Sequence, residues 1–93
     1  MLELVQIRKI DNSYSLSTIF VNPNHIVMLS EHREYSSDLK EGKMNLGLNP
    51  ITVFTKLVVN EGSNSASFVV IGEPSVIESK LNKSFSKRKL LRG

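Results

Sequence analysis

The sequence predicts a small, mostly β domain (β+α), with an antiparallel sheet or half-open barrel of four to five strands and one C-terminal helix. Short runs rich in β-branched and aromatic residues recur along residues 1–71. Turn-forming residues separate these runs, and the apolar spacing becomes helical after residue 72. The 93 residues fit a single domain. We divide it into a β-rich body that runs into the helix start, residues 1–79, and a basic helical end, residues 80–93.

The first two strands are predicted at residues 2–10 and 15–21. The first, LELVQIRKI, alternates in part between apolar and polar side chains. The turn signal Asp11-Asn12-Ser13 follows it, because Asp and Asn side chains satisfy their own local backbone. The second, SLSTIFV, is rich in the residue types that favour strands.

A third strand is predicted at residues 25–30, HIVMLS, after a bend at Asn22-Pro23-Asn24. Proline has no N–H to donate to a central ladder, so the chain bends or bulges there. The four consecutive apolar residues 26–29 indicate that both faces of this strand are covered, by a partner subunit or by the C-terminal helix. We therefore expect the protein to form homo-oligomers.

Residues 31–50 form the longest polar stretch of the chain and contain two glycines and a proline. Long loops without secondary structure are uncommon in compact domains and are often functional. We interpret this segment as an extended hairpin tip or a mobile functional loop. Four apolar side chains can fold part of it back on the body: Leu39, Met44, Leu46 and Leu48.

The clearest strand is residues 51–59, ITVFTKLVV, and a hairpin returns it through residues 66–71, ASFVVI. The turn between them, residues 60–64, has Gly62 available for positive φ. A helix then opens at residues 72–75, where Pro74 is suited to a first turn and Ser75 matches a capping box with Glu78. The spacing of Ile77, Leu81 and Phe85 predicts one apolar stripe packed on the sheet.

The positive charge is concentrated at the C-terminus. Residues 80–93 carry six Lys and Arg and no acid, which gives +6, whereas residues 1–79 carry six basic against nine acidic residues, which gives −3. One interpretation is a solvated helix end whose cations suit the negative end of the helix dipole. The other is a site for an anion, namely nucleic acid, an acidic protein or an anionic membrane surface.

The candidate macromolecule-binding residues follow from this charge pattern. Five belong to the basic end, and two belong to the long polar segment as a second candidate surface. They are Lys83, Lys87, Arg88, Lys89 and Arg92, and Lys40 and Lys43.

No catalytic pattern stands out in the sequence. There is no G-x-S-x-G motif, no P-loop and no G-x-G-x-x-G after a strand. His25 and His32 are seven residues apart, which puts them on opposite faces of one strand, so a shared metal site would need a bend and a carboxylate such as Glu31 or Glu34. We expect a protein that is not an enzyme and uses no cofactor, metal or small-molecule substrate.

Composition gives a coarse expectation about location. The chain has no cysteine, so it has neither a disulfide framework nor a thiolate metal site. It shows no signal-peptide pattern and no apolar run of 18 residues. We expect no transmembrane segment and a cytoplasmic protein.

Three stretches of the chain, FVNPNHIVMLSE, ITVFTKLVVNEG and FVVIGEPSVIESKL, resemble the small bacterial flagellar-operon proteins of the FlbD/SwrD type. Matching places are occupied by Phe20, Asn22, Ile26, Thr52, Asn60, Gly62, Glu73 and Val76. The resemblance covers most of the body and implies the same fold and a flagellar role. The chain departs from that family in its longer segment 31–50 and in its basic tail.

The predicted function is a small non-enzymatic regulatory or adaptor module that binds another macromolecule, as a homo-oligomer. The first alternative is a nucleic-acid-binding protein that uses the basic tail, for which binding would depend strongly on salt. The second is a structural or assembly subunit of a phage or bacterial appendage, for which large homo-oligomers would be found.

Overall fold

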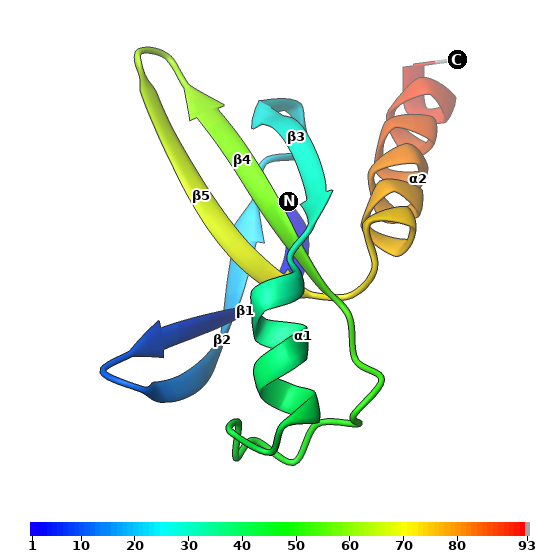
Figure 1. Cartoon of the computed structure of the whole chain (residues 1–93). Coiled ribbons are helices and arrows are strands. Elements are labelled where there is room, and N and C mark those ends of the chain that lie inside the picture. The colour runs from blue at the N-terminus through cyan, green and yellow to red at the C-terminus, as the bar shows by residue number, and fades with distance from the viewer. Residues whose placement is uncertain (93) are drawn as a thin grey trace.

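The computed structural model describes the backbone of residues 1–92 and the side chains of residues 1–83. Five strands, a short 3-10 turn and two α-helices follow one another (Figure 1): β1 Leu2–Ile10, β2 Ser13–Val21, η1 Pro23–His25, β3 Ile26–Glu31, α1 Arg33–Lys40, β4 Phe54–Glu61, β5 Asn64–Ile71 and α2 Pro74–Arg92. The strands form one antiparallel sheet in the order β2-β1-β5-β4-β3. The predicted fold class, a mostly β domain with a C-terminal helix, is confirmed.

Each face of the sheet carries its own hydrophobic cluster. Alternate residues of β5 show this directly, because Phe68 and Val70 join one cluster whereas Val69 and Ile71 join the other. The buried members of the first cluster are Leu4, Val21, Leu57, Val59, Val70 and Ile77. Those of the second are Ile7, Leu39, Met44 and Phe54. Helix α2 therefore covers one face, and α1 with the segment after it covers the other.

The interpretation of residues 31–50 as an extended hairpin tip or a mobile loop was wrong for residues 33–40, which form α1. The helix has Glu34 in its first turn and Lys40 in its last, which suits the helix dipole. It gives a weak sequence signal, since its eight residues include two serines and an aspartate, which favour turns over helix interiors. The expected folding back is confirmed: Leu39 and Met44 are buried in the second cluster.

The bend before β3 is the 3-10 turn η1. The side-chain oxygen of Asn22 accepts a hydrogen bond from the backbone N–H of Asn24, and the backbone N–H of His25 donates to the Asn22 carbonyl, each at 3.0 Å. Pro23 occupies the first position of the turn, where its missing N–H costs nothing. The strand consequently begins at Ile26 and not at the predicted residue 25.

Within a single chain one face of β3 is covered and the other is open, so cover by α2 is wrong for that face and cover by a partner subunit stays a prediction. Val27 and Met28 are 61% and 49% exposed, while Ile26 and Leu29 pack against the first cluster. The pairing of β3 with β4 shifts its register between Ile26 and Met28, so the four apolar residues do not alternate regularly. Helix α2 reaches β3, but it leaves these two side chains uncovered.

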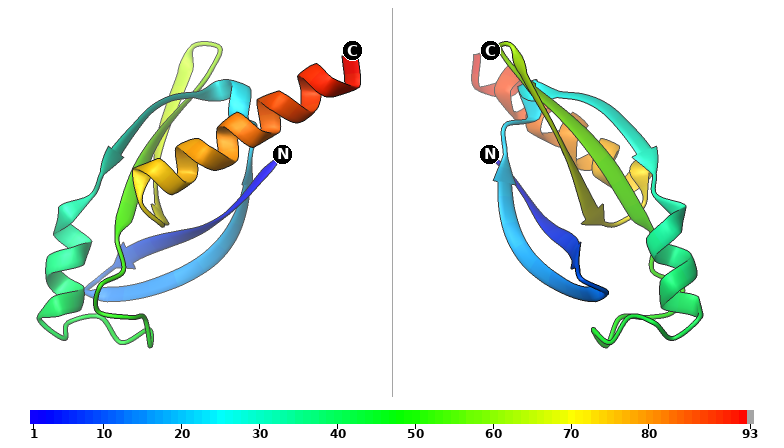
Figure 2. Two further views of the ribbon diagram at one scale, coloured as in Figure 1. Left: turned by 90° about the vertical axis from the view of Figure 1, so that its right-hand side faces the viewer. Right: turned by 60° about the vertical axis from the view of Figure 1, so that its left-hand side comes forward.

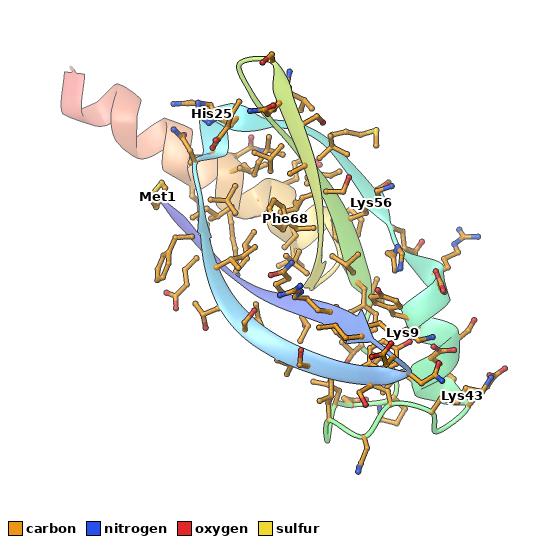
Figure 3. The ribbon with its side chains drawn as sticks, turned by 90° about the vertical axis from the view of Figure 1, so that its left-hand side faces the viewer. Met1, Lys9, His25, Lys43, Lys56 and Phe68 are labelled. Atoms are coloured by element: carbon orange, nitrogen blue, oxygen red, sulfur yellow. The ribbon has the colours of Figure 1, made fainter. Side chains whose placement is uncertain are left out.

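The sheet is curved and open because its two hairpins meet at one point. Strands β1 and β5 pair only at Gln6 and Val70. From there the hairpins β1–β2 and β4–β5 diverge (Figure 3). The two end strands β2 and β3 are joined by residues 22–25 alone, and α2 lies across the opening between β1 and β3 (Figure 2).

Two turns have the predicted residues at their tips. Asp11 and Asn12 both have positive φ, 49° and 68°, which is the signature of a type I′ turn between β1 and β2. Gly62, with φ of 61°, opens the turn between β4 and β5.

Among residues 1–92, no helix combines the length and the apolar character needed to cross a membrane.

Replacing Ile77 with alanine should destabilise the fold by about 2–5 kcal/mol, because this side chain is the contribution of α2 to the buried first cluster. Val76 is the matched control, since it is adjacent on the same helix but 47% exposed. Val76→Ala should change the free energy of unfolding by no more than about 0.5 kcal/mol. Urea denaturation measures both, and equal losses in the two variants would show that α2 does not cover the sheet as described.

Candidate functional site

An apolar groove opens between the end of β2 and the hairpin β4–β5. Its larger part, about 400 Å³, is lined by residues 18–21 of β2 and by Met1, Asn22, Val59, Glu61 and Phe68. A smaller part of about 150 Å³ shares Val59, Glu61 and Phe68 and continues along residues 64–66 toward the hairpin tip. We call the two parts together the hairpin groove.

The walls of the hairpin groove are apolar and partly open to solvent. Phe20 and Met1 are 63% and 82% exposed, and Phe68 is half-buried beside them. Among the described lining residues, Glu61 is the one with a charged side chain. Exposed apolar surface with a polar rim marks sites of interaction with other molecules.

A contact between a histidine and a glutamate side chain lies at the mouth of the hairpin groove. The Nδ1 atom of His25 lies 3.3 Å from Oε1 of Glu61. His25 belongs to η1 and Glu61 to the end of β4, so the contact links the β2–β3 connection to the hairpin tip. Figure 3 shows His25 at this end of the molecule, close to the tip of β4–β5.

A second polar cluster fixes α1 to the hairpin β1–β2. The carboxylate of Asp38 accepts hydrogen bonds from the Tyr14 hydroxyl and from Lys9 Nζ, the latter at 3.3 Å. The Tyr14 hydrogen bond and the nearby Lys9 hold the pKa of Asp38 below its usual value. Burial and the Asp38 carboxylate raise the pKa of Tyr14. The phenol therefore stays protonated and keeps donating to the carboxylate.

The ring of Tyr35 extends this cluster into the second hydrophobic cluster. Its centroid lies 5.1 Å from that of Tyr14, 4.4 Å from that of His32 and 6.2 Å from that of Phe54, in edge-to-face arrangements. These contacts hold α1 in place against the sheet. We assign the cluster a structural role.

The predicted basic residues whose side chains the structure describes lie on separate elements. Lys83 is exposed on α2, and the side chains of Lys87, Arg88, Lys89 and Arg92 lie outside the described residues. Lys40 is exposed in the last turn of α1. Lys43 lies 2.9 Å from Glu41, which raises the Lys43 pKa. Figure 3 shows Lys43 at the end of the molecule opposite the C-terminal end of α2.

The two histidines lie in different surroundings. His25 is at the mouth of the hairpin groove, whereas His32 precedes α1 with its Nε2 3.9 Å from Glu34, too far for a hydrogen bond. No group of three His, Asp or Glu close enough to hold a metal ion occurs within the part of the chain whose side chains are described.

Comparisons with protein-family models, with curated proteins and with solved structures give no match for this chain. The flagellar-operon resemblance stays a prediction. Its matching positions include the cap of η1 at Asn22, the turn glycine Gly62 and the exposed Phe20.

Sequence reasoning did not find the hairpin groove or the Tyr14–Asp38 cluster. Tyr14 and Asp38 are 24 residues apart, and no local pattern marks them as partners. The groove is formed by β2 and the distant hairpin β4–β5, so it arises from the crossing of the hairpins and not from a motif. The uncharged run at residues 13–21 was the one available signal of an exposed apolar edge.

Tyr14→Phe should lower the free energy of unfolding at pH 7. It should also make that free energy depend less on pH in the acidic range. The folded pKa of Asp38 is depressed, so its contacts stabilise the fold above its unfolded pKa of about 4 and are lost as the pH falls through the lower folded value. The difference in unfolding free energy between wild type and Tyr14→Phe should therefore shrink as the pH falls from 7 to below about 3.

Tyr35→Phe is the control, because it keeps the ring and leaves the Asp38 contacts in place. Chemical denaturation at several pH values measures these differences. The same pH profile for wild type and both variants would contradict the role assigned to the cluster.

Proposed function

We propose that this protein is a non-enzymatic adaptor module that binds an extended segment of a partner protein in the hairpin groove. The observation that carries the proposal is an exposed apolar groove beside an unpaired strand edge. Residues 64–69 of β5 pair with β4 on one side, while β1 reaches β5 only at Val70. Extended peptides bind such edges through backbone hydrogen bonds and place alternate side chains in adjacent pockets.

The shape of the hairpin groove favours a chain segment over a compact small molecule. The groove runs from Asn64 near the hairpin tip to Met1, and its two hollows lie one after the other along that path. A strand on β5 would place one side chain against Phe68. Glu61 at the mouth favours a Lys or Arg in the partner, because opposite charges at the rim speed and orient association.

Selection from a random extended-peptide library should enrich sequences with an apolar residue next to Lys or Arg. The affinity of an enriched peptide, measured by fluorescence anisotropy, should fall at least about tenfold with Phe20→Ala, a loss of about 1.4 kcal/mol. Glu61→Gln should weaken binding less and mainly reduce its salt dependence.

Ile51→Ala and Glu41→Gln are matched controls, since they remove an exposed apolar side chain and an exposed carboxylate away from the hairpin groove. Failure to enrich any peptide, or enriched peptides that bind Phe20→Ala as tightly as wild type, would contradict the adaptor proposal.

A second candidate function is nucleic-acid binding, and one observation favours it. Helix α2 continues as a single helix from Pro74 to Arg92. Six Lys and Arg lie in its residues 80–92, and no acidic residue follows Glu78. At a rise of about 1.5 Å per residue, residues 80–92 distribute these six cations over about 18 Å of helix axis, which suits contacts to a phosphate backbone without base specificity.

The nucleic-acid alternative predicts binding to single- or double-stranded nucleic acid that weakens steeply with salt. The slope of log K against log salt should approach about −0.9 for each phosphate contact on a duplex. A version ending at Leu81 should lose this binding, whereas a Lys40→Gln, Lys43→Gln variant should keep it. Fluorescence anisotropy across a salt series makes the comparison, and the absence of binding at low salt would eliminate this alternative.

A further inference from the structure

Strand β2 is an end strand of the sheet without the features that usually protect such an edge. Monomeric proteins block exposed edges with charged residues, proline, bulges or a covering element. The nine residues of β2, SYSLSTIFV, include no charged residue, proline or glycine. Their pairing with β1 is regular from Ser13 to Val21, whereas the other end strand, β3, has a register shift and lies beside α2.

The outer edge of β2 presents unused backbone groups. A two-residue type I′ turn closes on a hydrogen-bonded pair, here Ile10 and Ser13, so every second residue from Ser13 directs its backbone groups toward β1. The intervening residues direct theirs outward: Tyr14, Leu16, Thr18 and Phe20. In the described part of the chain, no backbone hydrogen bond outside the β1–β2 ladder involves residues 13–21.

We propose that β2 pairs with β2 of a second copy of this chain, antiparallel about a two-fold axis at Ser17. This register pairs all nine residues and places outward-directed residues opposite one another. Phe20 then faces the partner's Tyr14, and Leu16 faces the partner's Thr18. Aromatic pairs and pairs of an apolar with a β-branched residue are favourable across antiparallel strands. The two sheets join into one continuous sheet through about eight backbone hydrogen bonds.

The charges of the flanking strand β1 do not oppose a second copy in this orientation. Glu3 lies beside Phe20, at one end of the hairpin, and Lys9 lies beside Tyr14, at the other. Antiparallel pairing about the two-fold axis puts Glu3 of one copy three strands, about 14 Å, from Lys9 of the other, so no like charges of the β1 strands are brought together. The uncharged β2 strands meet without like-charge repulsion.

The dimer should dissociate on dilution. A nine-residue strand is about 30 Å long, and pairing along one edge buries less than the roughly 800 Å² per partner of a standard stable interface. Leu16 and Phe20, both exposed in the single chain, become partly covered. This proposal does not depend on peptide binding in the hairpin groove.

Sedimentation velocity of the full chain from about 10 µM to about 1 mM tests the proposal, a range that covers modest affinities. Wild type should pass from monomer to dimer. Ser17→Lys places two lysines directly opposite each other at the two-fold axis and should raise the dissociation constant at least about tenfold. Ser67→Lys makes the same change at an exposed position of β5 and should dimerise like wild type. Circular dichroism confirms that both variants fold.

Cysteine cross-linking tests the register, because the natural chain has no cysteine. Directly opposed, non-hydrogen-bonded residues have Cα atoms about 4.5 Å apart, which a disulfide can span. Ser17→Cys should therefore cross-link on mild oxidation, whereas Ser13→Cys and Ser67→Cys should not. A monomer at every concentration, a dimer unaffected by Ser17→Lys, or equal cross-linking of the three cysteine variants would overturn the proposal.

Discussion

The hairpin β4–β5 carries apolar side chains on both of its faces, and the rest of the fold follows from burying both sets. Leu57 and Val70 point to one cluster, and Phe54 points to the other, all at or near zero exposure. A sheet with apolar residues on both faces requires a cover on each side. Helix α2 supplies one cover and α1 the other. The turn into α2 is pinned to the hairpin, because Thr55 Oγ1 donates to the Gly72 carbonyl at 2.7 Å and the Gly72 N–H donates to Val53 at 2.8 Å.

The same constraint explains why the molecule remains open elsewhere. The hairpin β1–β2 contributes Leu4 to one cluster and Ile7 to the other, and it pairs with β5 only at Gln6. Beyond that pairing the two hairpins separate, which leaves the hairpin groove between them. The outer edge of β2 remains uncovered because the two helices pack on the two faces of the sheet (Figure 2). The hairpin groove and the outer edge of β2, the two surfaces proposed for binding, therefore both result from the way the two hairpins and the two helices pack.

Local chemistry made much of this fold predictable. Strand-forming runs located all five strands, Asp11 and Gly62 marked the hairpin turns, and Pro74 marked the start of α2. Helix α1 escaped prediction because its packing, through Leu39 and the Asp38 contacts, outweighs a poor intrinsic helix propensity. In the apolar run of β3, a register shift that is invisible in sequence turns Val27 and Met28 outward, away from the cover that α2 provides. The candidate site required knowledge of how distant hairpins cross, which no local pattern contains.

Residue-resolved amide hydrogen exchange in dilute solution tests the central claim most directly, since it reports which strands are buried on both faces and which edge is open. The amides of Leu57 and Val70 should exchange slowest, through global unfolding. The outward-directed amides of Leu16 and Thr18 should exchange orders of magnitude faster. Protection of these β2 amides equal to that of Val70 would contradict the account, because it would mean that the edge of the sheet is already covered within a single chain.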